Sequence, residues 1–409
     1  MLIIYYQISF ITLWFYRYVR LIVNCASSWT FKSVPPPDNP IYTSNDVTIL
    51  IPTICREDQY DDFKLCLQSV LATKPHGVLV STVKSDLLRI TELAHNIDSR
   101  IQVMAASFAN KRQQIYEAVP RIKTKITILA DDDVVWPPTL LPQTTQLVQP
   151  GLGIINRIWE YLGACYIQRR NFEIAATSHI DGGISCLSGR TAAYRREFLQ
   201  SEDCMEGYVN ERWGGKLLNT DDDNYLTRLL VAKGWGIRIQ MSKEAEVLTT
   251  LECTWDFLQQ CLRWARSNWR SNYLSMVIER HIWKQQPWSS YTLHLATISH
   301  SLWNDLSLLY LLHRSTITWD PSHRLLSFCI FGLWLLFTKV VKLIPHFALY
   351  PGDIFLLPVT FCFGYFHGLI KLYALVTLNR TTWGGRQIPN GMGENARVEK
   401  PLRQLKRCF

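Results

Sequence analysis

The chain has 409 residues, of which 48% are hydrophobic and 19% are charged, and 43 Lys and Arg against 34 Asp and Glu give a formal charge of +9. These shares exclude an intrinsically disordered chain. The 20 glycines and 18 prolines exclude collagen-like and low-complexity sequences. The 11 cysteines form no Cys-x-x-Cys pair, which argues against a zinc ribbon or a thioredoxin-like site and favours free thiols in a reducing compartment.

The N-terminal stretch is apolar and is followed by basic residues. Residues 2–16 carry no charge, and Arg17 and Arg20 come next. A secretory signal peptide has the opposite order, with its basic residues first. If the two arginines snorkel toward headgroups, residues 1–23 approach the ~20 residues that a membrane span needs. We therefore predict an uncleaved anchor over 1–23, joined by a Pro-rich linker over 24–45.

The region 46–290 alternates strand-like and helix-like segments. Short apolar runs predict strands, and apolar residues three and four apart predict helices. The predicted strands are 47–52, 77–83, 101–105 and 124–130, and the predicted helices between them are 61–73, 86–95 and 109–119. This alternation predicts an α/β fold with a doubly wound, mostly parallel sheet, which binds ligands at the carboxyl ends of its strands.

Three further apolar segments lie near the C-terminus, at 291–313, 325–344 and 354–378. They could be buried helices of a soluble core, but their clustering after a long polar region favours membrane helices over 291–378. The first is the weakest candidate, because Asp305 lies in its middle and a charge there is costly in a bilayer. A basic tail, 379–409, follows.

A first run of carboxylates, Asp131-Asp132-Asp133, directly follows the strand predicted at 124–130. In an extended segment Asp131 and Asp133 point the same way. Two oxygen ligands on one side suit Mg²⁺ or Mn²⁺, which also takes diphosphate oxygens and water. The alternative is a solvated acidic turn or a helix cap.

A second run, Asp221-Asp222-Asp223, precedes a helix-like segment at 224–230. Acidic residues favour helix starts, so a capping cluster is one interpretation. One cap needs only one acid, however. A carboxylate at this place can also act as a general base.

Other polar groups lie on predicted helices and turns. Gln260, Arg263 and Trp264 share one face of a helix that starts near 255, where Arg can pair with phosphate and Trp can stack on a sugar. The same helix also suits a membrane interface. Asn110-Lys111-Arg112 opens a helix and suits a diphosphate, whereas Cys186 to Thr191 is a small-residue turn that could be an ordinary loop.

In this order the motifs resemble the processive family-2 glycosyltransferases, above all hyaluronan synthases and fungal capsule-type polysaccharide synthases. The resemblance covers about 45–275 and a short tail element. Residues 47–53 look like the family's first strand, 110–112 like its Gly-Lys-Arg motif, 187–195 like its acceptor-side loop and 382–386 like its Trp-Gly-Thr-Arg stretch. The resemblance implies a GT-A-like fold flanked by transmembrane and interfacial helices.

The resemblance also implies roles for single residues. Asp131 and Asp133 would hold Mn²⁺ or Mg²⁺, and Asp223 would be the general base, with Asp222 as the alternative if the register slips by one. The substrate-binding set would be Thr53, Asp86, Lys111, Asp131, Ser188, Gly189, Gln260, Arg263, Trp264 and Trp383. Asp86 departs from the family pattern, since it lies three or four places after the position of the aspartate that contacts the nucleotide base in relatives.

The sequence thus predicts a membrane-bound inverting glycosyltransferase that moves a sugar from a nucleotide sugar, expected to be a UDP-sugar, to a growing polysaccharide. The catalytic domain would face the cytosol, in the plasma membrane or the Golgi, and its partners would be the donor, the polysaccharide and the bilayer, with no nucleic acid. One alternative is transfer of a single sugar to a lipid such as ceramide or dolichyl phosphate. Another is a non-enzymatic membrane channel or scaffold.

Overall fold

The computed structural model describes residues 2–33, 35, 39–140, 145–147, 154–251 and 254–381. The chain forms two compact units, which we describe one at a time. A helical unit comprises residues 1–32, 153–185 and 252–376, and an α/β unit comprises residues 33–152, 186–251 and 377–409. Each unit is thus assembled from three separate stretches of sequence.

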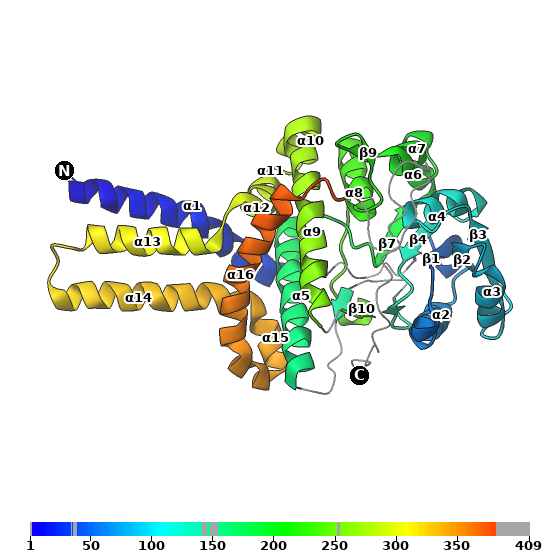
Figure 1. Ribbon diagram of the computed structural model, residues 1–409, viewed down its shortest axis with the longest axis horizontal. Helices are drawn as coiled ribbons and strands as arrows, with labels where there is room; N and C mark the ends of the chain where they lie inside the picture. The colour runs from blue at the N-terminus through cyan, green and yellow to red at the C-terminus, as the bar shows by residue number, and fades with distance from the viewer. Residues whose placement is uncertain are drawn as a thin grey trace. The chain divides into compact units, whose positions relative to one another are not determined.

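The α/β unit is built on a five-stranded sheet with the order β3-β2-β1-β4-β7 (Figure 1). Four strands are parallel, and only β7 runs antiparallel to its neighbour β4. The strands are β1 (Val47–Pro52), β2 (Gly77–Val83), β3 (Ile101–Ala106), β4 (Ile126–Ala130) and β7 (Thr191–Arg195). The predicted mostly parallel sheet is confirmed, and the bounds of β1 and β2 match the prediction.

Both faces of this sheet are covered, which explains why its central strand is apolar throughout. All six residues of β1 are buried. Ile49 and Ile51 belong to one core cluster and Leu50 to another, as the alternation of side chains along a strand requires. The helices of this unit are α2 (Tyr60–Ala72), α3 (Leu87–His95), α4 (Lys111–Ala118), α6 (Arg196–Leu199), α7 (Glu202–Asn210) and α8 (Asp222–Ala232).

Smaller elements complete the α/β unit. A three-stranded sheet has the order β5-β10-β6, and β8 pairs with β9 in a short hairpin. Their bounds are β5 (Val134–Val135), β6 (Thr145–Leu147), β8 (Arg212–Trp213), β9 (Lys216–Leu217) and β10 (Glu246–Thr249). Because β5 follows β4 after a turn of three aspartates, the acidic run lies between the two sheets.

Among its described residues, the helical unit contains six long helices and several short ones. The long helices are α1 (Leu2–Thr30), α5 (Ile154–Ile180), α9 (Asp256–Tyr273), α13 (Ser301–Ser315), α14 (Pro321–Val340) and α16 (Leu357–Val376). The short ones are α10 (His281–Gln285), α11 (Pro287–Ser289), α12 (Ala296–Ile298) and α15 (Ile344–Leu349). The sequence did not predict α5, because charged residues such as Glu160 and Arg169 interrupt its apolar periodicity.

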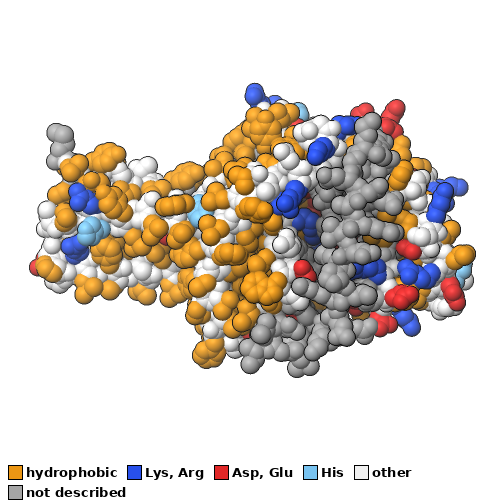
Figure 2. All heavy atoms as spheres, viewed as in Figure 1, with side chains coloured by type: hydrophobic (Ala, Val, Ile, Leu, Met, Phe, Trp, Pro, Cys, Tyr) orange, Lys and Arg blue, Asp and Glu red, His pale blue; other side chains and the backbone are white. Residues whose placement is uncertain are grey.

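Helices α1, α13 and α14 lie side by side in this unit (Figure 1). Their outer side chains form an apolar surface over all three helices (Figure 2). Exposed members of it include Ile4 at 59%, Trp303 at 63% and Leu333 at 66%. An exposed apolar surface of this kind is typical of a region that contacts another protein or a membrane.

By length and composition, two described helical segments are able to cross a membrane, Pro321–Leu349 and Pro351–Val376. They overlap the predicted segments 325–344 and 354–378. The third predicted segment, 291–313, is not one helix, because the backbone is extended at Ser299 and His300 and helix α13 starts only afterwards.

Asp305, the charge within that third segment, is paired inside the helical unit. Arg17 Nη2 lies 2.6 Å from Asp305 Oδ1, and Lys339 Nζ lies 3.2 Å from Asp305 Oδ2. The hydroxyl of Tyr365 donates to the same carboxylate at 3.0 Å. One buried carboxylate therefore links α1, α13, α14 and α16, as expected of ionisable groups in apolar surroundings.

Candidate active site

The first acidic run forms the turn after β4, at the carboxyl end of the parallel strands. Its three carboxylates have different partners. Asp132 accepts from Thr53 Oγ1 at the end of β1, and Asp133 accepts from Thr250 Oγ1 at 2.6 Å. Asp131 accepts from Lys111 Nζ at 2.7 Å. The predicted run is thus fixed by β1, by the segment after β10 and by α4.

Lys111 is the cation that joins the two acidic runs. Its Nζ lies 2.7 Å from Asp131 Oδ1 and 3.2 Å from Asp222 Oδ2, and it donates to the carbonyl of Gly189 at 3.3 Å. The side chain is only 12% exposed, so these contacts are shielded from water. The structure thereby brings together Lys111, Asp131, Asp222 and Gly189, which lie far apart in the sequence.

The charge at Asp133 is poorly compensated by protein groups. Burial, together with the neighbouring carboxylates of Asp131 and Asp132, raises the pKa of Asp133 to about 6. A divalent cation would relieve this repulsion, and carboxylate oxygens are the donors that Mg²⁺ and Mn²⁺ prefer.

The described residues hold no group of three or more His, Cys, Asp and Glu side chains placed to hold a metal. A site completed by diphosphate oxygens needs fewer protein ligands. Asp131 and Asp133 therefore fit a cation that is bound together with a nucleotide diphosphate.

The second acidic run forms the start of α8. Asp221 adopts a left-handed conformation with φ 63°, which is uncommon for a residue other than glycine. Asp222 faces Lys111, whereas Asp223 Oδ1 accepts from the backbone N–H of Asn224 at 2.8 Å. The two candidate bases thus differ in environment, since one contacts an ammonium group and the other an amide.

The turn at Ser188 and Gly189 packs directly on Asp223. A Cβ added to Gly189 would lie 3.3 Å from Asp223 Oδ2 and 3.6 Å from Asp223 Cβ. The turn is also tied to α8, because Leu187 N–H donates to Thr227 Oγ1 at 2.9 Å. Glycine at 189 therefore allows this loop to lie against the start of α8.

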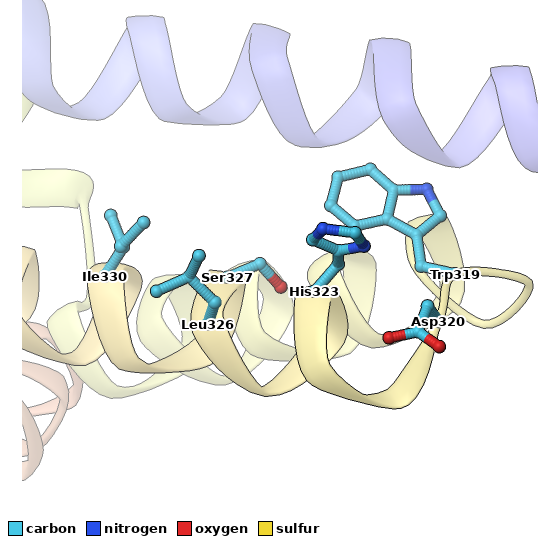
Figure 3. A pocket seen from close by; sticks show the side chains of 6 residues that line it. All are labelled: Trp319, Asp320, His323, Leu326, Ser327 and Ile330. Carbon is cyan, nitrogen blue, oxygen red and sulfur yellow. The ribbon is translucent and has the colours of Figure 1, made fainter.

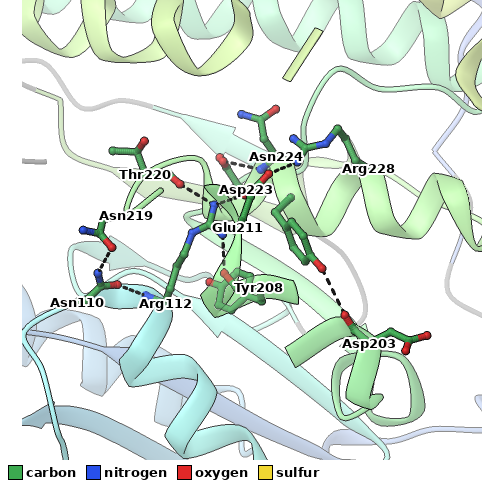
Figure 4. Close-up of polar contacts among 11 residues, drawn as sticks. Asn110, Arg112, Asp203, Tyr208, Glu211, Asn219, Thr220, Asp223, Asn224 and Arg228 are labelled. Carbon is green, nitrogen blue, oxygen red and sulfur yellow. Dashed lines mark hydrogen bonds and ion pairs between the residues drawn. The ribbon is translucent and has the colours of Figure 1, made fainter. Parts of the chain in front are cut away.

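Arg112 differs from its neighbour Lys111 in that it is buried, at 2% exposure, and its guanidinium points toward Glu211 and Thr220 (Figure 4). Its guanidinium donates to Tyr208 O at 2.5 Å, to Glu211 Oε2 at 2.6 Å and to Thr220 O at 2.6 Å. The other oxygen of Glu211 pairs with Arg228 of α8. Burial alone would lower the pKa of Arg112, but Glu211, Tyr208 and Asp222 raise it above its ordinary value. Sequence reasoning did not find this network, because Glu211 lies 99 residues from Arg112 and no local pattern links them.

Two predicted substrate residues have partners within the protein. Thr53 is 2% exposed, and its hydroxyl accepts from Cys55 N–H at 2.9 Å as well as donating to Asp132. Asp86 precedes α3, and one of its oxygens lies 3.5 Å from Arg89 Nη2. In this structure Thr53 thus supports the acidic turn.

The predicted residues Gln260, Arg263 and Trp264 lie on α9 of the helical unit. The ring of Trp264 lies 5.0 Å from that of Tyr166 on α5. Asp131, Lys111, Gly189 and Asp223 belong to the α/β unit. The remaining prediction, Trp383, lies outside the described residues.

A hollow at one end of α14 is lined by Trp319, Asp320, His323, Leu326, Ser327 and Ile330 (Figure 3). Its one carboxylate already has a structural role, since Asp320 accepts from Ser322 N–H at 3.0 Å and caps the helix. We find no constellation of acid, base and nucleophile there. The acidic turns of the α/β unit therefore remain the candidate active site.

Comparison with known proteins identifies the family of the chain. The profile described as glycosyltransferase like family 2 matches residues 45–267, which include both acidic runs. A protein named Type 2 glycosyltransferase from Pyricularia oryzae is 48% identical over 92% of this chain and 82% of its own length. Another of that name, from Zymoseptoria tritici, is 44% identical over 92% and 83%. Hyaluronan synthase 1 of Xenopus laevis is 28% identical over 52% of this chain and 34% of its own length.

Among solved structures, a mannosyltransferase from Pyrobaculum calidifontis, solved with GDP-Man and Mn²⁺, aligns with 93% of this chain and 99% of its own. The TM-score is 0.52 at 13% sequence identity, which shows a shared GT-A-like fold. With the matched profile and the fungal relatives, the conclusion is direct: this chain belongs to glycosyltransferase family 2 and is an enzyme that uses a nucleotide sugar.

Proposed function

We propose that the protein is a membrane-bound, inverting glycosyltransferase that extends a polysaccharide with sugars from a UDP-sugar. The observation that supports this most is the position of Lys111. It joins a carboxylate at a strand end, Asp131, to a carboxylate at a helix start, Asp222, beside a glycine turn. A diphosphate leaving group needs positive charge, and an acceptor hydroxyl needs a carboxylate base. Both a cation and carboxylates lie here.

Asp223 is the base in this proposal. Its carboxylate takes the proton of the acceptor hydroxyl, the hydroxyl oxygen bonds to the anomeric carbon, and the bond from that carbon to the diphosphate breaks. Asp222 is less suited, because the ammonium of Lys111 lies 3.2 Å away and stabilises its charged form. Attack from the face opposite the diphosphate inverts the anomeric configuration.

The leaving diphosphate is stabilised by cations. Lys111 supplies one positive charge, and Mn²⁺ or Mg²⁺ held by Asp131 and Asp133 would supply further charge to the diphosphate oxygens. The mannosyltransferase of the same fold holds Mn²⁺ with its GDP-Man. Gln260, Arg263 and Trp264 remain proposed contacts of the diphosphate and the acceptor sugar. Asp86, Ser188 and Trp383 remain proposed substrate contacts.

The polysaccharide product is supported by the relatives. Hyaluronan synthase 1 makes a polysaccharide by its name, and N-acetylglucosaminyltransferases from Rhizobium meliloti and Mesorhizobium japonicum also match. The competing function is transfer of one sugar to a lipid, for which the exposed apolar surface of the helical unit is the argument. Both functions use the same base and the same diphosphate site.

Product length separates the two. Purified protein in detergent is incubated with a panel of labelled nucleotide sugars, and nucleotide release is measured for each. We expect release with one or a few UDP-sugars and a labelled product that grows with time and stays in the aqueous phase. A product of constant size that partitions into organic solvent would establish the lipid acceptor instead. A panel that yields no nucleotide release above a Lys111→Met control would contradict the proposed reaction.

The helical unit suggests how the chain meets the membrane. Figure 1 shows the N-terminus of α1 at the same end of the three-helix group as the turn between α13 and α14. In our proposal α1 therefore crosses once, and α13 and α14 cross as a hairpin. The segment Pro351–Val376, although long and apolar enough to cross, stays on the cytosolic side, because Tyr365 of α16 contacts Asp305 near the start of α13. Two crossings after the catalytic domain keep the basic tail in the cytosol, as the positive-inside rule favours.

Cysteine labelling tests this topology. In sealed vesicles with the cytosolic face inward, an impermeant maleimide should label Thr318→Cys, in the exposed α13–α14 turn, and should not label Asn379→Cys, after α16. Cys253, Cys329, Cys362 and Cys408 are first replaced by serine, so that the cysteines that remain beside the introduced one are buried. After detergent is added, both should react. Labelling of position 379 in intact vesicles, or protection of position 318, would overturn the proposed arrangement.

A further inference from the structure

The second acidic run is held in place by a buried network behind it, and the network starts at Arg112. Arg112 lies in the first turn of α4, directly after Lys111. It donates to Thr220 O at 2.6 Å, and Thr220 is the residue before Asp221. The carbonyl of Thr220 belongs to the peptide bond that precedes Asp221, whose left-handed conformation at φ 63° is strained. A charged hydrogen bond from Arg112 therefore fixes this peptide bond.

Glu211 connects Arg112 to Arg228 within α8. Its Oε2 lies 2.6 Å from Arg112 Nη2, and its Oε1 pairs with Arg228. Arg228 follows Asp221 by seven residues, which is about two helical turns, so both lie on the same side of α8. All three side chains are less than 10% exposed. Breaking such a pair leaves a buried charge without its partner, which is costly, so the network resists displacement.

A second link joins the same two helix starts. Asn110 caps α4 by accepting from Arg112 N–H at 2.9 Å, and its amide group also pairs with Asn219 at 2.6 Å. Asn219 is two residues before Asp221. Residues 219 and 220 are thus both tied to the start of α4, the helix that carries Lys111 (Figure 4). These contacts fix the position of the Lys111 ammonium relative to the run Asp221-Asp222-Asp223.

We propose that Arg112 is a positioning residue, which acts through Thr220 and Glu211 to hold Asp223 where it meets the acceptor hydroxyl. It does not touch the donor in this assignment, because its guanidinium is buried and its two terminal nitrogens donate to Tyr208, Glu211 and Thr220. The inference rests on the proposed function of Asp223. It predicts that Arg112 matters for the transfer step and not for donor affinity.

The test is a double-mutant cycle between Arg112 and Asp223. Arg112→Lys keeps the charge but loses the forked contact, and we expect kcat to fall about 10- to 100-fold, the scale on which small misplacements reduce rates. The Kd of the UDP-sugar should change less than about twofold. In the Asp223→Asn background, Arg112→Lys should change the residual rate by less than about twofold, because the positioned base is already absent.

Two further variants keep the test decisive. Glu211→Gln preserves the side chain's shape and should lower kcat in the same direction, even if Arg112→Lys folds poorly. Lys233→Met is the matched control, since Lys233 lies 3.1 Å from Asp203 and links α7 to the distal end of α8. It should leave kcat within about twofold. Donor Kd, measured for every variant, reports whether the α/β unit is folded.

The outcomes separate the inference from the proposed function. If Arg112→Lys lowers the rate by the same factor with and without Asp223, or raises the donor Kd in step with the fall in kcat, the positioning role is refuted. If Asp223→Asn alone retains full activity, the assignment of the base fails first, and the inference fails with it. Non-additivity together with an unchanged donor Kd supports both.

Discussion

Asp223→Asn is expected to lower kcat by about 10²- to 10⁴-fold, the usual contribution of a general base. Asparagine keeps the size of the side chain and its hydrogen bond to the N–H of Asn224, so the start of α8 should persist. The donor should still bind, because the base acts on the acceptor. Turnover is measured by nucleotide release and donor affinity by titration calorimetry.

Asp222→Asn is the control for this variant. It removes the carboxylate 3.2 Å from Lys111 Nζ, so its main effect should be on the diphosphate end of the site. We expect a lower donor Kd, because the ammonium loses a competing anion, and a smaller loss of kcat. If Asp222→Asn were the inactive variant and Asp223→Asn active, the base would be one residue earlier than proposed.

Removal of divalent cations is expected to abolish turnover, and Mn²⁺ or Mg²⁺ should restore it. The pKa of Asp133 is raised to about 6 by burial and by its carboxylate neighbours, and a cation would neutralise the negative charge of this turn. Asp133→Asn should lose both metal-dependent donor binding and activity. Donor titrations in EDTA and in Mn²⁺ measure the effect.

Thr250→Val is the matched variant for the metal prediction. It removes the hydroxyl that donates to Asp133 at 2.6 Å but leaves both carboxylates in place. Its loss should therefore be small beside that of Asp133→Asn and should be reduced by raising the Mn²⁺ concentration. Full activity of the wild-type protein in EDTA would exclude the proposed role of Asp131 and Asp133.

The first four strands of the α/β unit follow from local sequence, and β1 shows why. All six residues of this strand are buried, so its sequence is a short, mostly apolar run with polar residues on either side. The bounds of such a strand can be predicted from composition alone. Helix α5 shows the opposite case. Charged residues along it pair with distant helices, for example Glu173 with Asn24 at 2.6 Å, and such pairings leave no local period to detect.

The candidate site also contains residues that local sequence predicts and residues that it does not. Asp131 and Asp133 follow a strand, and Asp223 starts a helix, so their places were predictable from neighbouring residues. Arg112 was not, because its surroundings are made by Tyr208, Glu211 and Thr220, about a hundred residues further on. Sequence alone showed two basic residues at a helix start and gave no reason to separate Lys111 from Arg112.

The pairing of Arg17 with Asp305 bears on how the protein is made. These residues are 288 positions apart, and Arg17 leaves the ribosome long before α13 exists. If α1 crosses the membrane as proposed, it holds an uncompensated charge near the bilayer surface during synthesis, and it reaches its final depth only when Asp305 arrives. Ribosome-stalled chains that end before residue 301 should consequently be extracted from membranes more easily than chains that extend past residue 340. Insertion of the first helix would then be completed among the last steps of synthesis.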